Sequence, residues 1–227
     1  MRAKRGHTRG LVAIYQTLER VVPFAAGWPG GDWPVSGNFN PPRFEVVAGA
    51  ILTQNVNWNN VEKALERMVQ ESLVDAEAIL LCPEPRLEAA IRPSGFFRQK
   101  AQRLKIMARF ISDYPGDFYR HVQREQLLAI QGIGPETADS ILLYACDQVH
   151  FVIDAYTRRI FERYGELDEK AGYDVIQDTF QSQLPVEISL YKKFHALIVE
   201  HAKRTCKKVP QCEECVLREE CRWAGDD

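Results

Sequence analysis

The most informative segment of this chain is Leu127-Leu128-Ala129-Ile130-Gln131-Gly132-Ile133-Gly134-Pro135-Glu136-Thr137-Ala138-Asp139-Ser140-Ile141-Leu142-Leu143. It contains an apolar helix end, a turn with two glycines and a second apolar helix. Gly132 and Gly134 allow positive φ angles and the close approach of another backbone. Pro135 stands where a first helical residue belongs, because its missing N–H group would have no partner there. The stretch therefore predicts two helices joined by a tight hairpin.

Such a hairpin directs backbone N–H groups outward at a helix start, where an anion such as a DNA phosphate can bind. A glycine turn between two core helices is the commoner explanation of a lone Gly-x-Gly. The longer string Gly132-Ile133-Gly134-Pro135-Glu136-Thr137-Ala138 resembles the helix-hairpin-helix motif of the endonuclease III superfamily of DNA glycosylases. There the hairpin reads Gly-hydrophobic-Gly and is followed by Thr-Ala. The resemblance implies that Gly132, Ile133, Gly134 and Thr137 bind DNA.

Composition sets wide limits on the class of protein. The chain has 227 residues, 45% of them hydrophobic, which is enough for one core or two modest ones. A net charge of −2 argues mildly against unspecific nucleic-acid binding, while basic runs at residues 98–105 and 203–208 permit it or are plain solvated faces. No apolar run follows Met1 and no segment approaches the length of a membrane span. We expect a cytoplasmic protein without a membrane partner, and a monomer.

Helical periodicity runs along most of the chain, and convincing strand alternation is absent. It predicts an all-α fold. Apolar spacing predicts helices over residues 11–21, 44–68 (two helices joined near 55–59), 76–81, 86–91, 96–111, 158–164, 175–184 and 188–203, besides the hairpin helices. The helix over residues 96–111 is expected to carry Lys100, Arg103 and Lys105 on its polar side.

The resemblance implies two helical subdomains with an active-site cleft between them. Residues 44–147 are expected to form a helical barrel that includes the hairpin. Residues 1–43 are expected to pair with residues 148–227 in a second subdomain, which carries a four-cysteine loop for a metal cluster.

Four cysteines near the end of the chain, Cys206, Cys212, Cys215 and Cys221, have the spacing C-x5-C-x2-C-x5-C. Disulfides are disfavoured in a reducing cytosol, and four close thiolates suit a [4Fe–4S] cluster or, as the alternative, zinc. The endonuclease III branch binds a [4Fe–4S] cluster through C-x6-C-x2-C-x5-C, one residue longer in the first interval. The resemblance implies that Lys207 and Lys208 in this loop reach a DNA phosphate. Cys82 and Cys146 lie on apolar stretches and are expected to be buried free thiols.

Asp154 follows the hairpin by about 20 residues, in Val152-Ile153-Asp154-Ala155-Tyr156-Thr157-Arg158-Arg159. Alone, it is a good helix N-cap between an apolar run and a helix. The segment resembles the Val-Asp segment of the superfamily, which implies that Asp154 is the essential aspartate. Breaking an N-glycosidic bond builds positive charge on the sugar, and a nearby carboxylate stabilises that charge and can activate water.

Glu136 bears on the type of reaction. In superfamily members that also cut the strand, the hairpin reads Gly-x-Gly-x-Lys, and the lysine forms a Schiff base with the sugar. Here Glu136 stands at that position, and a carboxylate cannot form a Schiff base. We therefore expect hydrolysis of the base without strand cleavage. An acid in the first turn of a helix also interacts favourably with the helix dipole, which is the plainer explanation.

Gln54 lies in Ile51-Leu52-Thr53-Gln54-Asn55. Superfamily members place a polar residue, often Gln, in the loop after this helix, where it fills the gap left by a flipped base. The resemblance assigns that role to Gln54, since flipping costs a few kcal/mol of stacking and pairing. A polar helix end is the structural alternative.

Several stretches resemble the 3-methyladenine DNA glycosylase III subgroup, among them residues 48–55, 92–96, 99–101 and 132–146 with Glu136 in place of lysine. An alkylated adenine carries positive charge and stacks well on an aromatic face. Trp33 and Trp58 are candidates for a stacking pocket with Pro34 as a wall, whereas core packing is the usual role of tryptophan.

The sequence thus predicts a monofunctional DNA glycosylase of base excision repair that acts on alkylated purines such as 3-methyladenine in double-stranded DNA. A glycosylase for mismatched or oxidised bases is the first alternative. A DNA-binding module without catalysis is the second, and an intact Asp154 counts against it.

Overall fold

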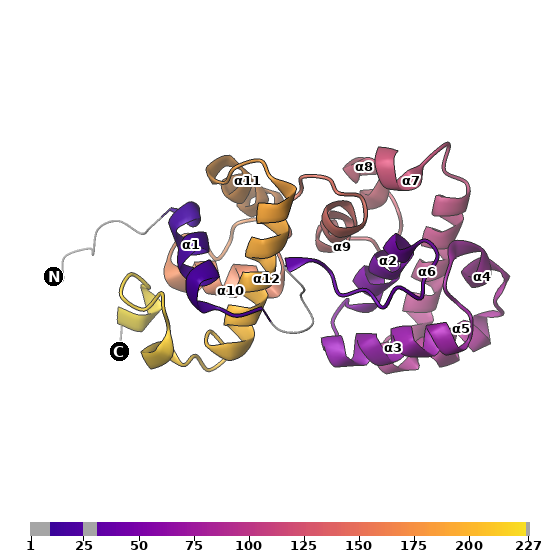
Figure 1. The fold of residues 1–227 in the computed structure, drawn as a ribbon, viewed down its shortest axis with the longest axis horizontal. Coiled ribbons are helices and arrows are strands. Elements are labelled where there is room, and N and C mark those ends of the chain that lie inside the picture. Colours follow the sequence, from indigo (N-terminus) through magenta and orange to yellow (C-terminus); the bar gives the residue numbers. More distant parts are fainter. Residues whose placement is uncertain (1–9, 25–30, 226–227) are drawn as a thin grey trace. The chain divides into compact units, whose positions relative to one another are not determined.

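The computed structural model describes residues 10–24 and 31–225, and every regular element in these ranges is helical (Figure 1). The prediction of an all-α fold is confirmed. The chain divides into two compact units: the hairpin unit, Val35–Gln148, and the terminal unit, formed by Met1–Pro34 with Val149–Asp227. Among the described residues, no helix combines the length and apolar character that a membrane crossing needs.

The hairpin unit is built around one buried helix. Its elements are α2 (Pro42–Leu52), α3 (Trp58–Gln70), α4 (Ala76–Leu81), α5 (Glu84–Ile91), the 3₁₀ turn η2 (Arg92–Ser94), α6 (Phe97–Ser112), α7 (Phe118–His121), α8 (Arg124–Leu128), α9 (Pro135–Ser140) and the π-helical segment η3 (Ile141–Ala145). Every residue of α2 from Phe44 to Leu52 is buried, as expected of a helix that is apolar on nearly all sides. Helices α3 and α6 and segment η3 pack against it.

The hairpin unit begins at Val35, earlier than the expected boundary at residue 44. Two local contacts explain the difference. The carboxylate of Glu45 accepts hydrogen bonds from the backbone N–H of Ser36 at 2.9 Å, and the ring of Phe39 lies 6.4 Å from that of Phe44. Both contacts tie the irregular segment before α2 to α2 itself.

One prediction about α6 is wrong. The sequence places Lys100 on the polar side of this helix, but only 1% of its surface is exposed. Its ammonium group donates to two backbone carbonyl oxygens instead of to water. A lysine head can be buried where fixed acceptors replace its hydration. Cys82 and Cys146 are buried free thiols, as predicted.

The terminal unit contains α1 (Leu11–Val21), α10 (Ala155–Tyr164), α11 (Tyr173–Gln183), α12 (Ile188–Arg204) and the short 3₁₀ turns η4 (Cys212–Glu214) and η5 (Trp223–Gly225). Its core is a cluster of aromatic rings. Phe180 lies 4.7 Å from Phe151 and 4.8 Å from Phe161, and Phe194 is 5.7 Å from Phe151. The Phe161–Phe180 and Phe151–Phe194 contacts are edge-to-face and the Phe151–Phe180 contact is tilted, and such ring contacts add to the effect of burial. They fix the start of α10 relative to α12.

Candidate DNA-binding surface, active site and metal centre

The hairpin between α8 and α9 exposes its glycines and buries the residue between them. Gly132 has φ +85° and is exposed, as is Gly134 at the N-cap of α9. The side chain of Ile133 is 5% exposed, and its backbone N–H donates to Ile130 O at 3.0 Å. Ile133 thus anchors the turn from inside, so a phosphate at this turn would meet the backbone of the two glycines.

A buried ion pair fixes the two helices of the hairpin to each other. Arg124 on α8 donates from Nε and Nη2 to the two carboxylate oxygens of Asp139 on α9, at 2.8 and 3.1 Å. The Asp139 side chain is fully buried, and that of Arg124 is 16% exposed. Two parallel hydrogen bonds define the orientation as well as the distance of the pair.

Gln54 joins the loop after α2 to the hairpin. Its amide nitrogen donates to Gly132 O at 3.1 Å and to Thr137 Oγ1 at 2.9 Å, and its amide oxygen accepts from Arg103 Nη1. The structure thus brings together Gln54, Gly132 and Thr137. Entry of the Gln54 side chain into a DNA helix would break all three hydrogen bonds. The role of Gln54 as a gap filler remains a prediction.

Two residues that sequence reasoning missed stand out on this unit. Asn55, next to Gln54, is exposed and has φ +54°, and Phe96 is 66% exposed with φ +43°. A left-handed backbone is uncommon for a large aromatic residue and costs about 1–3 kcal/mol. Such strain clusters at functional sites. The adjacent residues Phe96 and Phe97 could have indicated this exposure from the sequence. Two neighbouring side chains at a helix start point in different directions, so only one of them is expected to face the core.

Glu136 and the two candidate tryptophans occupy different surroundings. Glu136 lies in the first turn of α9 and is exposed to solvent. Trp58 begins α3 and is half-buried in the hairpin unit, whereas Trp33 is buried in the terminal unit with Pro34 beside it in the chain. Their shared stacking pocket remains a prediction, because its members belong to separate units.

Asp154 is the N-cap of α10. Its Oδ1 accepts from the backbone N–H of Thr157 at 2.7 Å and from Thr157 Oγ1 at 2.8 Å. Its Oδ2 lies 3.6 Å from Nε2 of His195 on α12, and both side chains are largely buried. Sequence reasoning missed His195, since nothing in the apolar pattern of α12 marks it as a partner of a residue 41 positions earlier in the chain.

Opposing effects act on the charge of Asp154. Burial by itself raises the pKa of the carboxyl group, but His195 and the two Thr157 contacts outweigh it and hold the pKa below its usual value. The side chain is therefore an ionised carboxylate at neutral pH. It combines the N-cap role and the fixed negative charge, which the sequence left open as alternatives.

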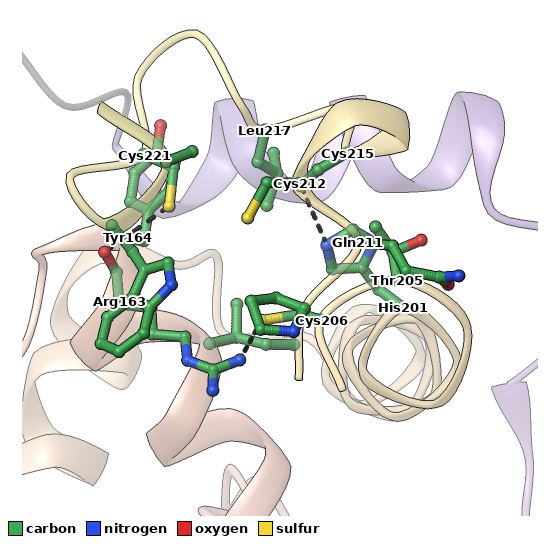
Figure 2. A pocket seen from close by; sticks show the side chains of 14 residues that line it. Arg163, Tyr164, His201, Thr205, Cys206, Gln211, Cys212, Cys215, Leu217 and Cys221 are labelled. Atoms are coloured by element: carbon green, nitrogen blue, oxygen red, sulfur yellow. Dashed lines mark hydrogen bonds between the residues drawn. The ribbon is translucent and has the colours of Figure 1, made fainter. Parts of the chain in front are cut away.

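The four cysteines line one pocket, together with residues from the end of α10, the end of α12 and the tail (Figure 2). Arg163 donates to Cys206 Sγ at 3.4 Å and to the carbonyl oxygens of Lys207 and Lys208 at 2.6 and 2.9 Å. These bonds shape the short loop before Cys212. The loop itself is exposed at Lys207 and Lys208, so their side chains reach solvent.

Buried groups border the same cavity. His201 Nε2 lies 3.6 Å from Cys215 Sγ, and burial lowers the pKa of His201 to about 4, so the ring is neutral. Burial also raises the pKa of the Cys215 thiol to about 11. Within the described residues, no three His, Cys, Asp or Glu side chains form a group close enough to hold a single metal ion.

Comparison with known proteins agrees with the hairpin geometry. The profile of the family described as HhH-GPD superfamily base excision DNA repair protein matches residues 48–185, which include the hairpin, Asp154 and the loop after α2. The chain belongs to this HhH-GPD superfamily. It is thus a member of a family of base excision repair DNA glycosylases, as the resemblance to endonuclease III predicted.

Three proteins illustrate what the chain is similar to. "Putative DNA repair glycosylase MJ1434" of Methanocaldococcus jannaschii is 46% identical, over 83% of this chain and 87% of that protein. Endonuclease III of Sulfolobus acidocaldarius is 35% identical, over 81% and 83%. The structure of H. pylori 3-methyladenine DNA glycosylase (MagIII) bound to 1,N6-ethenoadenine has 29% identity and a TM-score of 0.74, covering 85% of this chain and 96% of that one.

Proposed function

We propose that this HhH-GPD protein is a monofunctional DNA glycosylase that hydrolyses the N-glycosidic bond of alkylated purines such as 3-methyladenine. Its partner is double-stranded DNA with a damaged base. The observation that carries the proposal is the largely buried carboxylate of Asp154, held by Thr157 and facing His195, in a chain that has Glu136 where lyases have lysine. Likeness to the H. pylori 3-methyladenine enzyme supports the substrate class.

The chemistry of such a substrate matches these residues. A base with positive charge is already a good leaving group, so its departure needs little help from a general acid. As the bond breaks, positive charge grows on the sugar, and the Asp154 carboxylate stabilises it and orients the attacking water. Glu136 cannot attack the sugar to form a Schiff base, so the product is an abasic site in an intact strand. The hairpin glycines, Thr137, Lys207 and Lys208 are the proposed phosphate contacts.

Flipping a base costs stacking and pairing energy, so exposed side chains that contact the opened duplex can help to hold it open. Asn55 and Phe96 are exposed on the hairpin unit and both have a left-handed backbone, which is strained for Phe96 but common for asparagine. We assign them to contact with the distorted duplex, beside the predicted gap filler Gln54.

Heavily methylated duplex DNA tests the function. Free base is followed by chromatography and strand nicking on a denaturing gel, for wild type and Asp154→Asn. We expect release of 3-methyladenine without nicks, and a loss of at least about 100-fold in the variant. No release from methylated DNA, with thymine released from a T·G duplex, would replace the substrate by a mismatch. Nicking without alkali would overturn the monofunctional assignment.

The four-cysteine cavity is proposed to hold a [4Fe–4S] cluster through Cys206, Cys212, Cys215 and Cys221. All four donors are thiols around one space, which is the ligand set of such clusters. The bound cluster would supply a covalent cross-link of the tail, not a reacting group. Purified protein is expected to be yellow-brown, with iron and sulfide in equal amounts. A colourless preparation containing zinc would overturn this assignment.

A further inference from the structure

Two cationic residues on α6, Lys100 and Arg103, contact loops of the hairpin unit. Lys100 is the first. Its Nζ donates to Leu52 O, the last residue of α2, at 2.8 Å, and to Ser94 O at 2.6 Å. The loop with Gln54 and Asn55 begins directly after Leu52, and Gly95-Phe96 directly after Ser94. One buried ammonium group therefore joins the roots of two exposed loops.

Arg103, one turn further along α6, contacts the hairpin. Its Nη1 donates to Gln54 Oε1, and Gln54 Nε2 in turn donates to Gly132 O and Thr137 Oγ1. The side chain also lies directly beneath Gly132, where a Cβ atom would stand 2.4 Å from Arg103 Nε and 2.9 Å from its Cγ. The Arg103 side chain therefore packs against Gly132 and leaves no room for a Cβ atom there.

We propose that Lys100 and Arg103 are positioning residues that hold three exposed segments, Thr53–Asn57, Gly95–Phe96 and the Gln131–Gly134 turn, as one preformed DNA-binding surface. The inference rests on the proposed function in that these segments are taken to contact the damaged duplex. Neither side chain needs to touch the base, because each acts through the backbone or through Gln54.

The physical reason lies in the cost of opening the duplex. Flipping a base is unfavourable, and a surface that must first order its loops adds the entropy of ordering to that cost. Short polar loops have few apolar contacts of their own to hold them. Charge-assisted hydrogen bonds to fixed carbonyl oxygens supply the missing rigidity, at roughly twice the strength of neutral ones. A functional surface is precise when the groups that support it are locked in turn.

The chain supplies a matched control on the same helix. Lys105 Nζ donates to the carbonyl oxygens of Ile79, Leu80 and Cys82 at 3.0, 3.2 and 2.6 Å, at the end of α4. Lys105→Met therefore removes the same charge and the same kind of hydrogen bond as Lys100→Met, away from the three segments. Arg103→Met completes the set.

Native-state hydrogen exchange tests the coupling. The reporter amides are Val56, Gly95 and Ile133, each hydrogen-bonded within or at the root of one segment, and Cys82 at the end of α4. After correction for global unfolding, we expect about tenfold faster exchange at Val56 and Gly95 in Lys100→Met, and at Val56 and Ile133 in Arg103→Met. Lys105→Met is expected to change Cys82 alone.

Binding to a duplex with a tetrahydrofuran abasic-site analogue, compared with the intact duplex, supplies the functional readout. Lys100→Met and Arg103→Met are expected to lose about tenfold of the preference for the analogue, while Lys105→Met keeps it. Equal effects of all three variants, or unchanged exchange in the segments, would overturn the inference. If wild type releases no alkylated base but exchange and preference change as expected, the proposed substrate fails and the inference stands.

Discussion

Asp154 shows how one carboxylate serves structure and chemistry at the residue scale. Its Oδ1 caps α10 through Thr157, and its Oδ2 faces His195. An N-cap alone needs neither the imidazole nor a largely buried carboxylate. The extra partner keeps the side chain charged against the effect of burial. The sequence pattern indicated the cap, whereas the contact with α12 required the packed terminal unit.

Replacement of His195 by Phe is expected to change the pH dependence of base release. Without the imidazole, burial raises the pKa of Asp154, so the acid limb of the rate profile moves to higher pH. We expect about a tenfold slower rate at about pH 5 and little change at about pH 8. Single-turnover release of 3-methyladenine across this range measures it. An equal loss of rate at every pH would show that His195 only supports the fold.

Lys100 leads to a stability prediction with a definite sign. Burial, with a smaller effect of Arg103, lowers the pKa of Lys100 to about 8, whereas the unfolded chain keeps its proton to the ordinary pKa of 10.5. Between about pH 8 and 10.5 the unfolded state therefore binds more protons than the folded state. The Lys100 contribution to the unfolding free energy rises as the pH increases through this range and falls as the pH decreases through it.

Denaturant unfolding of wild type and Lys100→Met across that pH window measures this contribution. The unfolding free energy of wild type minus that of the variant should increase with pH, because the variant has no proton to lose at this position. A difference that stays constant with pH would contradict the prediction.

At the scale of elements, the hairpin combines an internal anchor with an exposed turn. Ile133 and the Arg124–Asp139 pair fix α8 against α9, and Gln54 connects the turn to the end of α2. The two glycines look alike in sequence but have different surroundings. Gly132 has a positive φ and rests on Arg103, whereas Gly134 is extended, and a Cβ atom added there would meet no described atom within 4 Å.

Alanine at each glycine is therefore expected to separate folding from DNA binding. Gly132→Ala combines a left-handed backbone with a collision against Arg103, and should lower the unfolding free energy by about 1–3 kcal/mol. Gly134→Ala should leave stability within about 0.5 kcal/mol. If the Gly134 backbone contacts a phosphate, the added methyl group lowers the affinity for duplex DNA. Thermal unfolding and fluorescence anisotropy measure the two effects, and an unchanged affinity of Gly134→Ala would remove this contact.

At the scale of the whole molecule, the tail of the terminal unit is tied to α10 by side chains and backbone groups near the cysteine cavity. Tyr164 OH donates to Glu220 at 2.8 Å, and the backbone N–H of Arg222 donates to Tyr164 O. Arg163 donates hydrogen bonds to the carbonyl oxygens of Lys207 and Lys208, and its guanidinium group lies over the ring of Trp223. The cavity itself lies between these contacts, so a group bound there would join the two ends of the tail.

Loss of the proposed cluster is thus expected to loosen the tail selectively. Cys215→Ala should raise hydrogen exchange across residues 205–224 by at least about tenfold while the hairpin unit keeps its protection. Mass spectrometry of peptides from both units measures the effect. Equal loss of protection in both units would show that the chain folds as one cooperative body.

The all-α class, the hairpin, the positions of most helices and the membership of the superfamily could be predicted from the order of the amino acids, because they depend on local signals: apolar periodicity, glycine and proline placement and a short motif. The sequence also indicated Asp154 and the four cysteines. Three features could not be predicted in this way and became evident from the packing of the helices: Lys100 is buried, Gln54 is hydrogen-bonded to the hairpin, and His195 faces Asp154. Each joins residues far apart in the chain, and which distant groups meet depends on how whole helices pack.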